Sequence, residues 1–408
     1  MSVAAAARYR WVVLAVGCTG TLVTGALRQG MPALGPEFRD VFGLTLGQIG
    51  VLFAVQTLGF TLGLVPWGAL ADRTGERPVL AGGLAATAAG LALSAEAGSF
   101  GLLLAGLFLT GFFGSSATGA SGRAIMGWFA RAERGFVLGI RQTAIPVGGA
   151  ITALSLPAIA LAADLRTALL ALGAFALAAA IVAAVWMRDP PPAEAPKGFV
   201  ATPPMRDRRI WRLGVGSGLF VIAQAAVIGF TVLFLVDEHG MTVGQAALVL
   251  AAIQLVAAVA RIAVGRWSDR LDRRIEPLRH AGLLGGVLVA AMALLSGAPN
   301  LVLVPLLIAG GAAMSSWNGL SFTAAAEIAG RARAGTAMSL QNMLVSILGA
   351  VASPLFGLLA EASSYRVAFL AVAAAPIAGW WVLRPLEGDE DERAEARRQR
   401  LATYAVGS

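Results

Sequence analysis

The 408-residue chain has little of what soluble proteins use for chemistry and for a hydrated surface. It has one cysteine, Cys18, which excludes an intramolecular disulfide. Its two histidines, His239 and His280, are too few for a histidine-based metal site such as H-E-x-x-H. Only 13% of its residues are charged, against roughly 25% in an average soluble protein. No nucleophile, base and acid form a catalytic constellation, so we expect no enzyme, no metal and no cofactor.

Apolar and small residues take the place of charge. Hydrophobic residues make up 57% of the chain, which also has 50 glycines, and its mean hydropathy is +0.76. Small residues let helices approach closely in a bilayer, where packing drives their association. The composition therefore predicts a membrane protein.

Twelve apolar runs are long enough to cross a membrane, since a bilayer core about 30 Å thick needs about 20 helical residues. The first run follows Arg8 and Arg10 and resembles a signal peptide, but it continues to Leu34 and has a counterpart in the second half. The runs lie near 11–34, 46–70, 79–96, 100–127, 135–163, 166–187, 211–236, 244–265, 278–298, 301–326, 335–360 and 366–384.

A proline-rich, charged segment separates the sixth run from the seventh, and such a composition is typical of a linker. We therefore expect a six-helix bundle at 1–187, a cytoplasmic linker at 188–210, a second six-helix bundle at 211–386 and a charged cytoplasmic tail at 387–408.

The basic residues orient the chain. Of 31 lysines and arginines, all but seven fall on the side that carries both ends of the chain. The exceptions are Arg39, Arg166 and Arg366 in loops of the other side, and Arg28, Arg123, Arg141 and Arg261 within runs. The positive-inside rule places the basic side in the cytoplasm. The net charge of +8 is then a topology signal rather than a sign of nucleic-acid binding, and we expect a multi-pass protein of the inner or plasma membrane.

The two halves repeat each other. The sequence TLGQ at 45–48 returns as TVGQ at 242–245, and GFFGSSATGAS at 111–121 returns as GAAMSSWNGLS at 311–321. Six spans duplicated in one orientation predict two parallel bundles, related by an axis along the membrane normal.

Two short loops carry unusual charge for so apolar a chain: GALADRTGERPVL at 68–80, after the second span, and GRWSDRLDRR at 265–274, after the eighth. Both resemble the loop motif of the major facilitator superfamily, Gly-x-x-x-Asp-Arg-x-Gly-x-Arg. The resemblance covers nearly the whole chain and implies an all-α fold of twelve transmembrane helices in two pseudo-twofold-related bundles. It also implies transport by alternating access. The gating residues that it implies are Gly68, Asp72, Arg73, Gly75 and Arg77 in the first copy, and Asp269 and Arg270 in the second.

The resemblance implies which helix ends the loop aspartates contact. Asp72 is expected at the N-terminus of the eleventh span, near Gly335 and Thr336, where free N–H groups and the helix dipole favour a carboxylate. By symmetry, Asp269 is expected at the start of the fifth span. Such contacts would hold the cytoplasmic side closed, and the alternative is a solvated loop. We expect Arg123 and Arg261 to pair with gate carboxylates.

Arginines within spans are the leading candidates for binding, because an intramembrane charge costs about 2.5–3.5 kcal/mol on insertion scales. Arg28 lies past the middle of the first span and is followed by Gln29. It binds an anionic group in the central cavity or, alternatively, extends to the outer headgroups. Arg141 and Gln142 lie in the fifth span, with Gln341 and Asn342 at the matching place in the second half. They line the same cavity or make structural bonds.

Polar residues near the midplane are the other candidates. Ser115 and Ser116 lie near the centre of the fourth span, and Ser315 and Ser316 near that of the tenth, followed by Trp317 and Asn318. They contact a ligand or bind neighbouring helices together. Secondary candidates for the cavity lining are Gln56, Gln224 and Gln254.

No carboxylate lies deep in a span, so the charge inside the membrane is positive. We therefore expect a monomeric transporter of a small, carboxylate-like anion, coupled to a proton or to an exchanged anion. The main alternative is a proton-coupled multidrug exporter, which usually needs a membrane carboxylate; Glu37 or Glu327 at the span ends would have to titrate. A non-transporting membrane receptor is disfavoured because both halves retain the gate motif.

The orientation is testable with single cysteines in a Cys18-free background. Cysteines at Glu96 and Asp237 should react with an impermeant thiol reagent added outside, whereas those at Glu194 and Arg333 should not, because the positive-inside rule places them in the cytoplasm. A reversed pattern would overturn the orientation.

Overall fold

The computed structural model describes residues 3–129, 133–189, 204–330 and 333–406. This part of the chain is helical, and its helices form twelve segments long and apolar enough to cross a membrane. The predicted fold class is confirmed. In the first half the elements are α1 (Val3–Gly25), η1 (Ala26–Gly30), η2 (Met31–Leu34), α2 (Gly35–Phe42), α3 (Leu46–Thr74), α4 (Glu76–Ala95), α5 (Phe100–Gly114), α6 (Ser116–Trp128), α7 (Arg134–Ala162) and α8 (Leu165–Trp186). In the second half they are η3 (Pro204–Arg206), α9 (Arg208–His239), α10 (Val243–Leu271), α11 (Ile275–Leu294), α12 (Asn300–Ser316), α13 (Asn318–Ala329), α14 (Ala334–Ala362) and α15 (Tyr365–Val406).

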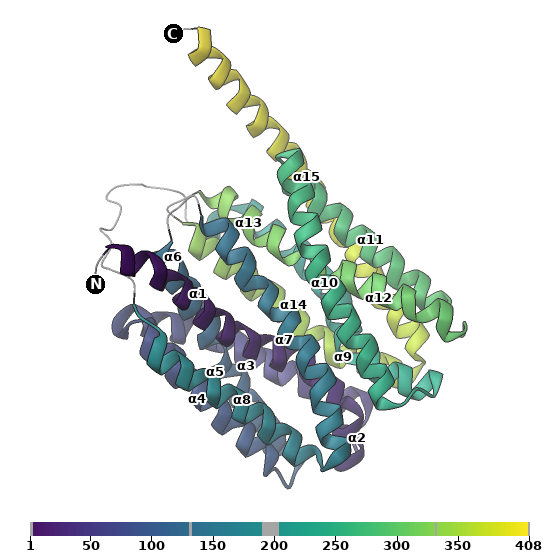
Figure 1. The fold of residues 1–408 in the computed structure, drawn as a ribbon. Coiled ribbons are helices and arrows are strands. Elements are labelled where there is room, and N and C mark those ends of the chain that lie inside the picture. The colour runs from purple at the N-terminus through teal and green to yellow at the C-terminus, as the bar shows by residue number, and fades with distance from the viewer. Residues whose placement is uncertain (1–2, 130–132, 190–203, 331–332, 407–408) are drawn as a thin grey trace.

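The helices form two bundles (Figure 1). Elements α1 to α8, from purple to teal, make one bundle, and α9 to α15, from teal to yellow, make the other. The bundles meet along two helix pairs, α3 with α14 and α7 with α10. The start of α1 and the end of α15 lie at the same end of the molecule, and α15 extends beyond the bundle there (Figure 1). We call this end inner and the opposite end outer.

The repeat in the sequence is a repeat in local structure. At the start of α3, the Thr45 side chain accepts from the N–H of Gln48, whose side chain accepts from the N–H of Thr45. Thr242 and Gln245 form the same capping box at the start of α10. Such reciprocal bonds satisfy two donors that a helix N-terminus leaves free.

The first span departs from its repeat. Trp11 and Thr45 are 34 positions apart, whereas their counterparts Trp211 and Thr242 are 31 apart. The seventh span is the unbroken helix α9, but the first changes to a π turn at Ala26–Gly30, then to a 3₁₀ turn, and then to α2. It therefore reaches Phe42 rather than ending near the predicted Leu34. Three additional residues accompany an irregular segment that carries Arg28.

Polar contacts at the outer end join the bundles. The Arg39 guanidinium donates two hydrogen bonds to the carboxylate of Asp237, at 2.7 and 2.8 Å, and the Tyr365 hydroxyl donates to the same carboxylate at 2.8 Å. Nearby, Glu361 Oε2 accepts from the N–H of Gly47 at 3.2 Å. Among the described residues, the ion pair between Arg39 and Asp237 is the one that crosses between the bundles. These contacts hold the outer ends of the two bundles together in this structure.

We expect Asp237→Asn to weaken outer closure. A partly exposed pair contributes about 0.2–1 kcal/mol, so the population should shift by up to about fivefold toward the outward-open state. The distance between spin labels at Val41 and Leu301, two exposed outer positions on opposite bundles, should lengthen. Glu96→Gln is the matched control, because its ion pair with Arg166 lies within one bundle at the same end. An equal shift in both variants would contradict the role of the Arg39–Asp237 ion pair in closing the outer end.

Candidate functional site

The π turn places Arg28 in a recess of the first bundle. The recess is lined by Thr24, Leu27, Arg28, Gln56, Phe60, Gly111 and Gly114, and its volume is about 10 Å³, which is about the space of one water molecule. The Arg28 guanidinium lies over the Phe60 ring, 4.4 Å from its centroid, at the separation of a cation–π contact. The predicted neighbour Gln29 is buried on the turn, and its Oε1 has no partner among the described residues.

Arg141 is buried and bonded within the first bundle. Its Nη1 donates to the hydroxyls of Thr21, at 3.4 Å, and Ser121, at 3.2 Å. Its counterpart Gln341 donates to Ser321 at 2.7 Å. Since Ser121 and Ser321 are themselves counterparts, both halves use one polar bond to join the fifth span to the fourth, or the eleventh to the tenth. These contacts fit the structural alternative, although Arg141 Nε has no partner in the described structure.

Arg261 bridges the two bundles without a carboxylate among its recorded partners. Its Nε donates to the main-chain carbonyl of Ser315 at 2.7 Å, and its Nη1 donates to that of Gln142, in the other bundle, at 3.2 Å. The carboxylate partner that we expected is thus replaced by carbonyl oxygens in the part of the chain that the structure describes. Asn342 lies in the same helix as Gln341 and is half-buried.

The serine pairs mark helix breaks that the sequence analysis missed. Helix α5 ends before Ser115 and α6 begins at Ser116; α12 ends at Ser316, one residue before Trp317. The Ser115 and Ser116 side chains occupy the space that a Cβ would need at Gly63 and Gly83 of neighbouring helices. Their contacts therefore favour helix packing within the first bundle.

In the second bundle, Trp317 is 1% exposed and packs edge-on against Phe220, 6.0 Å between ring centroids. Asn318 Nδ2 donates to the Ser315 carbonyl at 3.3 Å and to Gln224 Oε1 at 3.5 Å. Trp317 is therefore a core residue here, whereas Asn318 remains a polar group at a helix break.

The first gate loop is held by a carboxylate that the sequence analysis did not single out. Asp189, after the sixth span, accepts from the N–H groups of Glu76 (2.5 Å) and Arg77 (3.1 Å) at the start of α4. Gly75 has a φ of +91°, and a Cβ there would lie 2.6 Å from the Asp189 carboxylate. This position thus requires glycine both for its conformation and for its space.

The other predicted residues of this loop lie on the inner surface. Arg73 and Arg77 are exposed, and Arg77 Nε donates to the Ala184 carbonyl at 2.7 Å. Gly68 faces open space. The side chains of Asp72 and Arg123 lie outside the described residues, so their gate contacts stay predictions.

The second gate loop has the same kind of cap, a carboxylate that accepts from N–H groups at a helix start. Glu390 accepts from the N–H groups of Arg274 (2.6 Å) and Ile275 (3.0 Å), at the start of α11. Asp269 pairs with Arg274 of its own loop at 2.5 Å, while Arg270 is exposed. The contact expected between Asp269 and the start of the fifth span stays a prediction.

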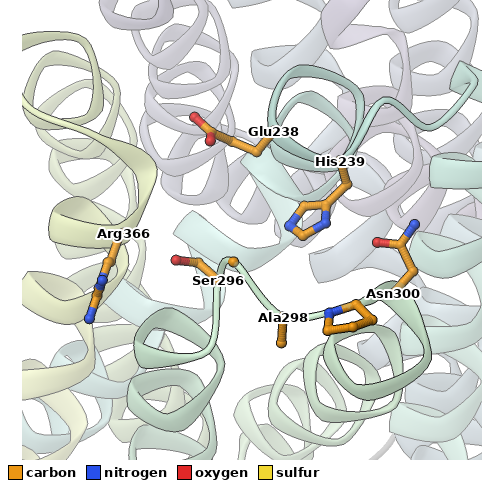
Figure 2. A pocket seen from close by; sticks show the side chains of 8 residues that line it. Glu238, His239, Ser296, Ala298, Asn300 and Arg366 are labelled. Atoms are coloured by element: carbon orange, nitrogen blue, oxygen red, sulfur yellow. The ribbon is translucent and has the colours of Figure 1, made fainter.

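A larger hollow, about 530 Å³, opens at the outer face of the second bundle (Figure 2). Glu238 and His239 line it from the end of α9, Ser296 and Asn300 from around the loop before α12, and Arg366 from the start of α15. It contains none of the predicted binding residues. Its lining combines the acidic Glu238, the basic Arg366 and His239 at an exposed surface. The hollow therefore does not favour a ligand of one charge sign. Among the described residues, no group of three or more His, Cys, Asp or Glu is arranged to hold a metal ion.

Two bundles of six spans, duplicated gate loops and arginines within the spans together define a membrane transporter fold. The family model of the Major Facilitator Superfamily matches residues 17–354 and 213–406, and the chain belongs to this family.

The chain is also similar to individual members of known sequence or structure. The chain is similar to the Uncharacterized MFS-type transporter Rv2994 of Mycobacterium tuberculosis, at 32% identity over 96% of this chain and 89% of that protein. It is similar to the Probable sulfoacetate transporter SauU of Cupriavidus necator, at 26% identity over 88% and 90%. Its fold resembles a bacterial homologue of the human lysosomal transporter Spinster, in an inward-facing and unoccupied conformation. That TM-score is 0.77 at 17% identity, over 94% of this chain and 98% of that one.

We expect Asp189→Ala to destabilise the first bundle by about 0.5–2 kcal/mol, since removal of a capping side chain has this effect. Asp189→Asn should retain most of the stability because an amide oxygen still accepts from the Glu76 and Arg77 N–H groups. The midpoint of detergent-induced unfolding of the purified protein measures both. If alanine and asparagine were equally harmless, Asp189 would not be a cap.

Proposed function

We propose that this family member is a secondary active transporter that carries a small organic or inorganic anion by rocking of its two bundles. The observation that carries the proposal is Arg28. Its guanidinium lies at an irregular turn within the first span, and the recess around it holds no carboxylate among the described residues that line it. A cation in such surroundings favours an anionic ligand, because an intramembrane charge without a counter-ion is costly.

The charge balance of the membrane interior supports the same substrate class. The described polar partners of Arg141 and Arg261 are hydroxyl and main-chain carbonyl oxygens, so neither guanidinium is neutralised by a carboxylate among them. The relative named as a probable sulfoacetate transporter adds support, since sulfoacetate is a small organic anion. The water-sized recess indicates that a ligand larger than one water would require the recess to widen.

The remaining parts of the proposal follow from the sequence. The protein lies in an inner or plasma membrane with both termini in the cytoplasm. It acts as a monomer, and a proton or an exchanged anion is the coupled partner. The bundles are taken as 1–187 and 211–386, joined by the linker at 188–210.

One observation favours a second candidate function, proton-coupled efflux of lipophilic cations. Glu37 lies at the outer end of the first span, and its Oε2 is buried without a hydrogen-bond partner among the described residues. A carboxyl group in such a place is suited to carrying a proton. Glu327, the other acid considered for this role, instead pairs with Arg274 at 3.1 Å at the inner end.

Substitution of Arg28 tests the anion proposal. Arg28→Lys keeps the charge but loses the bidentate fork, and Arg28→Ala loses both, so anion affinity should fall in the order Arg, Lys, Ala. The loss for Ala should be roughly 10- to 100-fold, the range for a hydrogen bond to a charged group. Arg141→Gln is the comparison, and its effect should be smaller because it recreates the Gln341 bond of the other half.

The measurement is uptake or counterflow in proteoliposomes, with acetate, sulfoacetate, nitrate and sulfate tested beside lipophilic cations. Neutral analogues should bind weakly and respond little to either Arg28 variant. Transport of the cations alone, with Arg28→Ala fully active, would refute the anion proposal and favour efflux.

A further inference from the structure

We infer that Gln254, on α10 of the second bundle, is a positioning residue for Arg28, and that it links the rocking of the bundles to the presentation of the binding guanidinium. The inference rests on the proposed role of Arg28 in anion binding. It starts from one bond: Gln254 Nε2 donates to the main-chain carbonyl of Gln29 at 3.3 Å, across the interface between the bundles. Gln254 is completely buried.

The local sequence deprives the Gln29 carbonyl of one main-chain donor. Met31 donates its N–H to Ala26 five residues back, which is the π pattern, and the chain then tightens into a 3₁₀ turn. In 3₁₀ geometry the donor for Gln29 would be the residue three positions on, and that residue is Pro32, which has no N–H. Within a membrane a carbonyl without a partner is costly. Gln254 supplies a donor to this carbonyl from the other bundle.

Helix α7 of the first bundle packs against this turn. A Cβ at Gly25 would overlap the Ile145 carbonyl oxygen, and one at Gly30 would overlap the Thr152 side chain. At Gly149, a Cβ would meet both the Gln29 side chain (2.8 Å) and Gln254 (3.4 Å). The turn is therefore packed closely against α7 of its own bundle, whereas its contact with α10 crosses between the bundles and would change if the bundles moved apart.

Loss of the Gln254 bond has a direct consequence for Arg28. Conversion of a π turn to α geometry removes one residue from the turn, and each α-helical residue rotates by about 100°. A change of this size would carry the Arg28 side chain away from Phe60 and out of the recess formed with Gln56. By linkage, a ligand that binds Arg28 in one orientation would favour the bundle arrangement that maintains it.

A cysteine at the turn tests the inference without a ligand. In Arg28→Cys protein lacking Cys18, a small methanethiosulfonate reagent should modify the introduced thiol at least threefold faster when Gln254→Met is added, because methionine has a similar shape but cannot donate. Thr231→Val is the matched control: it also removes a fully buried polar group of the second bundle, and that hydroxyl donates to the Val227 carbonyl of its own helix. Equal rates with and without Gln254→Met, or an equal effect of the control, would overturn the inference.

A binding series gives an independent readout. Gln254→Met should weaken sulfoacetate binding about 2- to 10-fold, the value of one hydrogen bond, in the Arg28 protein, and less than twofold in Arg28→Lys protein. An equal loss in both backgrounds would mean that Gln254 does not act through Arg28. If no anion binds the wild type, the proposed function fails, and the thiol modification rates of the Arg28→Cys protein still decide the inference.

Discussion

The structure depends on one constraint: a backbone N–H or C=O in the hydrocarbon region has no water to bond, so every departure from the helical pattern needs a partner from elsewhere. Most of the chain meets this constraint with continuous helices. At Ala26–Gly30 the helix changes to a π turn, and a side chain 225 residues away donates a hydrogen bond to the carbonyl of Gln29. An irregular turn that accepts a hydrogen bond from the other bundle is sensitive to how the bundles are arranged, and the binding candidate Arg28 lies on that turn.

The duplication separates what the fold needs from what the substrate needs. The capping boxes at Thr45 and Thr242 and the carboxylates of Asp189 and Glu390 recur in both halves, so they serve the architecture. Arg28 does not recur: the matching stretch of the second half, Ala225 to Ile228 on the unbroken helix α9, is apolar throughout. Polar or charged groups that break the repeat are therefore better candidates for substrate recognition than those that keep it.

The sequence predicted the twelve spans, the duplication and the gate loops because these depend on local hydropathy and on motifs repeated along the chain. It did not predict the breaks at Ser115 and Trp317, since serine in an apolar run reads equally as a ligand or as a packing residue. It also missed Asp189, whose partners at the start of α4 are more than 100 residues away in sequence. Contacts between distant segments leave little local signal. One signal was available for the first span: the three residues that it has in excess of its repeat.

The two bundles also differ in charge at the Arg28 level, and this difference suggests separate roles for them. If Arg28 binds an anion as proposed, the first bundle would hold it mainly, because the second bundle has neutral residues at the corresponding place. The second bundle contacts the first through the neutral donor Gln254 and through Arg261, whose guanidinium bonds the Gln142 carbonyl. In the proposed mechanism the first bundle would supply most of the affinity, and the second bundle would contact the turn that carries Arg28. Substrate binding and bundle movement would then be coupled through a few hydrogen bonds whose individual strength is small enough to be broken in each cycle.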